Sequence, residues 1–292
     1  MSLMSLVIDE SKNLTGENLV RARAPIAGII TGDTRGFKRK VEQGHVFMEG
    51  GNPQGTPFIF CHGIFGSYRN IAEIGEALFS DYRVIIPCMP MYDAPLNQCT
   101  VEDLSQYLEK FVNDFNLKNI VLVGNSMGGG AVLLYAIRNS HNVKKLILFA
   151  SSGLSFIPMR GGAMKLKNFE YVKELLGDIF YEKKAFNNDE FKEVFDVLQN
   201  KSTLLRILSF TRSTKRNFLH QELSKLDIPA LVIWGKQDTV TPPFIAEEFR
   251  VHLKNSQVQY IDNCGHVPCY EKPQECLAHI LPFLDQKTTN TR

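Results

Sequence analysis

The sequence predicts an α/β fold in which helices cover both faces of a mostly parallel sheet. Six short runs rich in β-branched and aromatic residues indicate strands at 57–61, 82–87, 119–124, 144–150, 230–235 and 258–262. Stretches with helical patterning alternate with most of them, at 70–79, 100–115, 127–139, 243–253 and 273–284. A repeated strand–helix–strand order is typical of a parallel sheet. The chain of 292 residues, 44% of them hydrophobic, is long enough for one large core.

The remaining segments divide the chain into regions. Residues 1–45 form an N-terminal extension and first-strand region, and 38–51 is expected to add a strand or hairpin at one sheet edge. The core comprises 46–153 and 227–292. Residues 154–226 have helical patterning without a convincing strand, which predicts an inserted helical cap. The cap acts as a lid over a site, or it only packs on the core.

Composition excludes several classes of partner. The net charge is +2 from 33 basic and 31 acidic residues, so no overall field attracts nucleic acid or an anionic membrane, and we expect a small-molecule substrate. No apolar run is long enough to span a membrane, and acidic residues come too early for a secretory signal. Six widely spaced cysteines indicate reduced thiols and a cytoplasmic location. Cys264, His266 and Cys269 lack further ligands, so no metal is expected.

The stretch 122–132, LVGNSMGGGAV, has a serine where a strand passes into a helix. Gly124, Ser126 and Gly128 fit the pattern G-x-S-x-G, in which a strained turn projects the serine hydroxyl above the sheet. The following helix directs its N-terminus, and the backbone N–H of Met127, toward any oxyanion formed near the serine. The alternative is a glycine-rich turn with an incidental serine.

An aspartate and a histidine follow two later strands. Asp238 comes after strand 230–235 and His266 after strand 258–262, which gives the chain order Ser, Asp, His expected of this architecture. Both positions fall at the carboxyl edge of a parallel sheet, where ligands gather. A serine needs such a base and an orienting acid to become a nucleophile.

The segment HGIFG, residues 62–66, also follows a strand directly. Its backbone is expected to present the N–H of Ile64, or alternatively of Phe65, opposite that of Met127 to form an oxyanion hole. The ring of His62 is expected to fix this loop by hydrogen bonding.

From residue 46 to 284 the chain resembles the α/β-hydrolase superfamily, through the motifs HGIFG, GNSMGG, WGKQD and CGHVPCYEKP. The resemblance implies an eight-stranded sheet, a helical cap after the sixth strand and no cofactor. It also implies catalytic roles for Ser126, Asp238 and His266. GNSMGG and the WG before the acid are similar to carbon–carbon bond hydrolases of ring-cleavage products, which commonly carry tryptophan at the position of Val267.

Three functions are open to this sequence. The first is hydrolysis of carboxylic esters (EC 3.1.1) through an acyl-enzyme, and the second is carbon–carbon bond hydrolysis by the same triad. The third is a non-catalytic ligand-binding protein on the same fold. The sequence leaves the oligomeric state open, with a homodimer as one candidate. Substrate contacts are predicted for Phe65, Asn125, Arg206, Arg212 and Val267.

Overall fold

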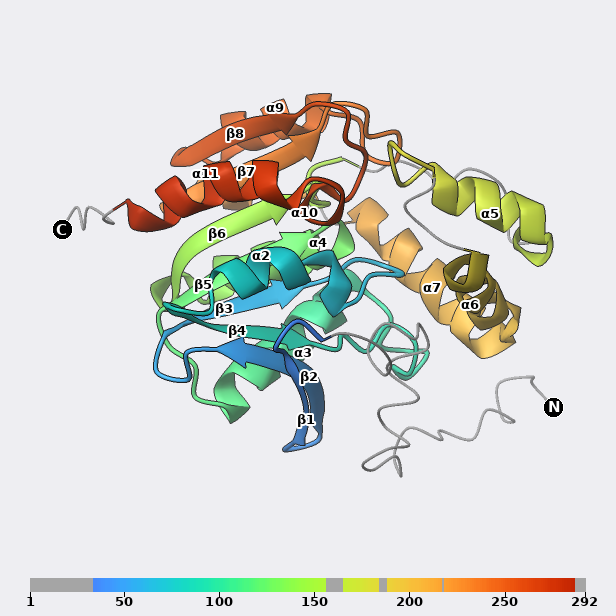
Figure 1. Cartoon of the computed structure of the whole chain (residues 1–292), viewed down its shortest axis with the longest axis horizontal. Helices are drawn as coiled ribbons and strands as arrows, with labels where there is room; N and C mark the ends of the chain where they lie inside the picture. The colour runs from blue at the N-terminus through green and yellow to red at the C-terminus, as the bar shows by residue number, and fades with distance from the viewer. Residues whose placement is uncertain (1–33, 156–164, 184–187, 217, 287–292) are drawn as a thin grey trace.

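The computed structural model describes residues 34–155, 165–183, 188–216 and 218–286. Its strands form one eight-stranded sheet in the order β1-β2-β4-β3-β5-β6-β7-β8 (Figure 1). From β4 to β8 every neighbouring pair is parallel, while β1–β2 and β2–β4 are antiparallel. The predicted α/β fold with a mostly parallel sheet is confirmed.

Each predicted strand is present, with ends that agree within two residues. The strands are β1 (Lys38–Glu42), β2 (His45–Gly51), β3 (Thr56–Cys61), β4 (Tyr82–Pro87), β5 (Ile120–Asn125), β6 (Val143–Phe149), β7 (Ala230–Gly235) and β8 (Ser256–Ile261). The central strands β5 and β7 are buried along their whole length. Strands buried on both faces read as continuous apolar runs, which is why the sequence located them well.

The first two strands form a hairpin at the sheet edge. Gln43 and Gly44 connect them and both have positive φ, 52° and 76°. Two consecutive positive φ values give the twist that a two-residue hairpin loop needs. The structure therefore selects the hairpin from the two alternatives for 38–51, whereas residues 1–33 of the predicted extension lie outside the described residues.

Helices cover both faces of the sheet. On one face pack α3 (Val101–Asp114), α4 (Met127–Arg138), α8 (His220–Leu223) and α9 (Phe244–His252), and on the other α2 (Ala72–Ala77) and α11 (Pro273–Asp285). Consecutive side chains of a strand point to opposite faces of the sheet. Ile59 and Phe60 of β3 therefore belong to two different apolar clusters, one on each face. The sheet is thus shielded from water on both sides.

Local sequence explains where α3 begins. Thr100 caps α3 by accepting from the N–H of Asp103, whose carboxylate in turn accepts from the N–H of Thr100. The predicted helix 70–79 is shorter, because a 3₁₀ turn (Tyr68–Asn70) precedes α2. The short α10 (Pro268–Glu271) was not predicted.

Between β6 and β7, the described parts of the cap region 154–226 contain helices joined by turns and no strand. They include α5 (Phe169–Gly177), α6 (Asn188–Gln199) and α7 (Lys201–Ser213) before α8. Asn200 separates α6 from α7, because its side chain accepts from the N–H groups of Ser202 and Thr203 and caps the second helix. Figure 1 shows α5, α6 and α7 together at one end of the sheet, the end toward which β3, β5 and β6 point.

Candidate active site

Ser126 occupies a strained turn between β5 and α4. Its φ is 53° and its ψ is −120°, a conformation that costs a non-glycine residue about 1–3 kcal/mol. The turn is held by long-range backbone bonds, since the N–H of Ser126 donates to the Phe149 carbonyl at 3.0 Å and its own carbonyl accepts from Ser152 at 3.0 Å. The predicted strand-to-helix elbow is therefore present.

The glycines around Ser126 are needed for close backbone contacts. A Cβ on Gly128 would lie 2.1 Å from the Cys61 carbonyl oxygen, and one on Gly124 would lie 2.6 Å from the Cα of Gly129. Real Cβ atoms do not approach backbone this closely, so strand β3, strand β5 and helix α4 can meet only at glycine. The same contacts bring the loop after β3 against the serine, since a Cβ on Gly63 would lie 3.0 Å from the Cβ of Ser126.

Asp238 follows β7 in a buried turn and has several hydrogen-bond donors. Its Oδ1 accepts from the N–H groups of Val240 and Thr241 at 2.8 and 2.9 Å. Its Oδ2 accepts from the Thr241 hydroxyl at 2.8 Å and lies 2.8 Å from Nδ1 of His266. A carboxylate with these donors is fixed in orientation, so one oxygen is directed at the imidazole.

His266 lies in the turn after β8 and is 5% exposed. Because Nδ1 faces the Asp238 carboxylate, it carries the proton, which leaves Nε2 as an acceptor. The amide of Asn125, the residue before Ser126, donates to the His266 carbonyl at 3.3 Å. The turns that carry Ser126, Asp238 and His266 therefore meet at one edge of the sheet.

The loop after β3 presents one backbone N–H in preference to another. Phe65, at φ 61°, donates its N–H to the hydroxyl of buried Tyr92 at 2.9 Å. That N–H is already engaged, so the geometry favours Ile64 of the two alternatives for the oxyanion hole. Nδ1 of His62 lies 2.8 Å from the Gly63 carbonyl oxygen, in agreement with its expected role in fixing the loop.

The remaining predicted substrate contacts divide into three kinds. Asn125 is 4% exposed, and its side-chain amide donates to the carbonyls of Phe149 and His266. Arg206 is half-buried, and its Nε donates to the Ala94 carbonyl at 2.6 Å, while Arg212 is exposed. Phe65 and Val267 pack against apolar clusters beside the site. Contact of these side chains with substrate stays a prediction.

Three side chains that help to build the site were not identified from the sequence. Tyr92 supports the loop after β3, Thr241 supports Asp238, and Glu271 accepts from backbone N–H groups around His266. Tyr92 and Thr241 lie a few residues beyond a predicted strand end or motif, and Glu271 lies within the motif CGHVPCYEKP. That position is a usable signal, because the carboxyl ends of parallel strands meet.

Cys264, two residues before His266, is fully buried. Burial raises the pKa of its thiol well above the ordinary value, so the inert neutral thiol is its dominant form. Among the described residues no group of three or more His, Cys, Asp and Glu side chains is arranged to hold a metal ion. Cys264 thus has a packing role.

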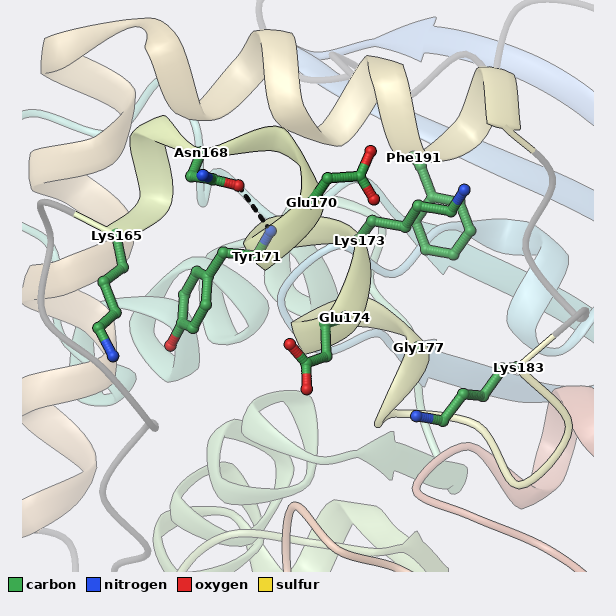
Figure 2. Close-up of a pocket in the computed structure, with 9 residues that line it drawn as sticks. All are labelled: Lys165, Asn168, Glu170, Tyr171, Lys173, Glu174, Gly177, Lys183 and Phe191. Atoms are coloured by element: carbon green, nitrogen blue, oxygen red, sulfur yellow. Dashed lines mark hydrogen bonds between the residues drawn. The ribbon is translucent and has the colours of Figure 1, made fainter.

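A pocket of about 660 Å³ lies elsewhere, on α5 in the cap (Figure 2). Three of its lining residues are lysines. Lys165 lies over the ring of Tyr171 and Lys173 over that of Phe191, while Lys183 pairs with Asp178 at 3.5 Å. Two of the three lysines thus lie over aromatic rings of the cap, and the third has an acidic partner there.

A mostly parallel sheet with a buried Asp–His pair and a serine elbow at its carboxyl edge is the architecture of an α/β-fold hydrolase. The chain belongs to the alpha/beta hydrolase fold family, which it matches over residues 56–273.

Relatives within this family have several activities. The chain is 28% identical over 84% of its length to a 2-hydroxy-6-oxo-6-(2'-aminophenyl)hexa-2,4-dienoic acid hydrolase of Metapseudomonas resinovorans, 89% of which is covered. It is 26% identical over 80% of its length to a monoacylglycerol lipase of Bos taurus, 77% of which is covered. An α/β-hydrolase enzyme from a lagoon-sediment metagenome aligns with TM-score 0.67 and 28% identity, over 85% of this chain and 97% of that one. Hydrolysis is the activity these relatives share.

In the described part of the chain, no helix combines the length and apolar character needed to cross a bilayer.

Proposed function

We propose that the protein is a serine hydrolase in which Ser126 is the nucleophile, His266 the general base and Asp238 the orienting acid. The observation that carries this proposal is the buried contact of 2.8 Å between Asp238 Oδ2 and His266 Nδ1, on turns that converge beside Ser126. Asp238 holds the imidazole in the tautomer whose Nε2 accepts a proton. The imidazolium formed during reaction is then stabilised by the adjacent carboxylate.

The reaction proceeds in two halves. Ser126 Oγ loses its proton to His266 Nε2 and bonds to the substrate carbonyl carbon, and the resulting oxyanion accepts from the N–H groups of Met127 and Ile64. His266 then returns the proton to the leaving group as its bond to carbon breaks. Water, deprotonated by the same imidazole, adds to the acyl carbon and releases the acid with Ser126 restored. No cofactor enters either half.

Carboxylic esters of small molecules are the proposed substrates. This machinery acts on any acyl group that places its carbonyl between Ser126 and the two amides. The alcohol released from an ester is a better leaving group than the carbon group released in carbon–carbon bond hydrolysis. The relative from Bos taurus is a monoacylglycerol lipase. The proposal is thus an esterase of the carboxylic-ester class.

Carbon–carbon bond hydrolysis is the second candidate. It is favoured by the similarity to a dienoic acid hydrolase and by Arg206, a half-buried cap cation able to pair with an acidic substrate. For either candidate we propose a cytoplasmic enzyme, because the six cysteines, all within the described residues, form no disulfide. A homodimer stays a proposal.

Labelling with a fluorophosphonate tests the nucleophile. The protein should be labelled at Ser126, and Ser126→Ala should abolish the label and lower ester turnover by a factor on the order of 10⁴ or more. Ser140→Ala, an exposed serine beyond the far end of α4, is the matched control and should behave as wild type. A label that persists in Ser126→Ala would contradict the assignment.

A substrate panel then separates the candidates. Turnover of short p-nitrophenyl esters without a ring-fission dienoate supports the esterase, and the reverse preference supports carbon–carbon hydrolysis. Binding of either compound with no turnover, together with absence of label, would instead favour a ligand-binding protein.

A further inference from the structure

The cap meets the catalytic turns through the short segment 178–181, which directly follows α5. Three hydrogen bonds join the two. His266 donates its backbone N–H to the Ile179 carbonyl at 2.7 Å, and Tyr181 donates its N–H to Glu271 Oε2 at 2.7 Å. The Thr239 hydroxyl donates to the Asp178 carbonyl at 2.9 Å. This segment therefore contacts the turn after Asp238 and the turn of His266 at once.

Glu271 is the side chain shared by both partners. While Oε2 accepts from Tyr181 of the cap, Oε1 accepts from the N–H of Gly265 at 3.0 Å and of Val267 at 3.4 Å. These two residues flank His266 on either side. One carboxylate thus binds the backbone before the histidine, the backbone after it and the cap.

Packing around this carboxylate is close. A Cβ on Gly265 would lie 2.6 Å from the Ile179 carbonyl oxygen and 2.8 Å from the Tyr181 nitrogen, so the cap segment lies directly on a residue that has to be glycine. Phe180 is buried and its ring contacts that of Tyr270 edge-on, with centroids 5.8 Å apart. Burial raises the pKa of the Glu271 carboxyl, against the three backbone N–H groups that lower it, and the charge of Asp238 adds to the rise.

We propose that Glu271 is a positioning residue that fastens cap segment 178–181 to the His266 turn, so that the seating of the cap and the placement of the histidine are coupled. This rests on the proposed serine-hydrolase function. Two carboxylate oxygens are required, because each serves a different partner. A glutamine has a single acceptor oxygen, and its amide N–H would face a backbone N–H on the other side. The end of α5 is accordingly the fixed end of the cap.

Glu271→Gln tests the coupling, with Glu275→Gln as the matched control. Glu275 is exposed on the adjoining helix α11 and lies 3.8 Å from Lys272. At a temperature well below unfolding, Glu271→Gln should lower kcat for a p-nitrophenyl ester roughly 10- to 100-fold with KM little changed, since small misplacements of catalytic groups have effects of this size. Fluorophosphonate labelling of Ser126 should slow by a similar factor. Glu275→Gln should match wild type.

Amide hydrogen exchange measures the coupling without activity. In Glu271→Gln, exchange should accelerate together in 178–181 and 263–267. Faster exchange in only one of these segments, or kcat and exchange equal to those of Glu275→Gln, would overturn the proposal. A wild-type protein that neither labels nor turns over esters would defeat the proposed function, while the exchange arm would still test the coupling.

A second variant covers the case in which Glu271→Gln does not fold. Thr239→Val removes the hydroxyl bonded to the Asp178 carbonyl and keeps Glu271 in place. It should accelerate exchange in 178–181 and lower kcat severalfold, about the effect of one neutral hydrogen bond. Faster exchange in this segment with unchanged kcat would show that cap seating does not reach the histidine, and would overturn the proposal.

Discussion

The carboxyl edge of the sheet and the cap differ in how firmly their side chains are held. Asp238 and His266 are 4% and 5% exposed, and each bonds to neighbouring turns through both its ring or carboxylate and its backbone. In the cap, Leu205 is 55% exposed, and one hydrogen bond holds the Arg206 guanidinium to the Ala94 carbonyl. The catalytic side chains at the sheet edge are thus held by more hydrogen bonds than these cap side chains are.

This difference assigns separate tasks to the two regions. Chemistry requires atoms placed within a fraction of an ångström, which only a rigid first layer with supporting bonds provides. Recognition tolerates variation, because one or two side chains can decide which substrates are accepted. Substitutions at the sheet edge should therefore lower kcat for every substrate, whereas substitutions in the cap should change KM for some.

The largest effect is expected for Asp238→Asn. An amide cannot hold His266 in the required tautomer, so kcat should fall by a factor on the order of 10³–10⁴ for all substrates. Steady-state kinetics with two unrelated esters measures this. The exposed Asp262→Asn, which loses only a pair with Lys236 at 2.8 Å, is the control. A loss confined to one ester would break the distinction between edge and cap.

Tyr92→Phe should have the next largest effect. Removing the hydroxyl leaves the part-buried N–H of Phe65 without its acceptor, so the oxyanion loop loses its support and kcat should fall about tenfold. Tyr82→Phe, at the opposite end of β4, serves as the matched substitution. If the Tyr92 variant raised KM and kept kcat, the loop would belong to substrate recognition.

Arg206→Lys is expected to discriminate between substrates. A guanidinium can donate to a carboxylate in bidentate fashion while keeping its bond to the Ala94 carbonyl, which lysine cannot reproduce. KM for an acidic substrate should rise about tenfold and that for a neutral ester should not change. Arg39→Lys, exposed on edge strand β1, is the control and should have no effect on either. Equal changes on both substrates would show that Arg206 has only a structural role.

Lys145→Met should alter stability and not activity. The buried ammonium donates to the carbonyls of Phe283, Leu284 and Gln286 at the end of α11. Its removal leaves carbonyls unpaired and should lower the free energy of unfolding by about 1–3 kcal/mol in chemical denaturation. Lys144, at the preceding position, is exposed, and Lys144→Met should change neither the free energy of unfolding nor kcat. A fall in kcat at low temperature would argue that the site depends on the far end of the sheet.

Local sequence was sufficient to predict some helix boundaries and insufficient for others. The apolar helical pattern continues through Asn200, so periodicity does not separate α6 from α7. The capping bonds of the Asn200 side chain begin the second helix. The short α10 was missed because four residues are too few for periodicity to register. By contrast, the start of α3 is a local feature, since the capping box of Thr100 and Asp103 involves only residues three apart.

The sequence by itself determined the order of the strands along the chain, the serine elbow and the positions of Asp238 and His266 just beyond strand ends. Those are consequences of periodicity and turn chemistry, which act over a few residues. Only the tertiary structure decided that Phe65 donates to Tyr92, that Asn125 supports His266 and that Arg206 reaches Ala94, across separations of 27, 141 and 112 residues. Each pairing depends on how strands and cap come together in space, and no local pattern encodes the partner.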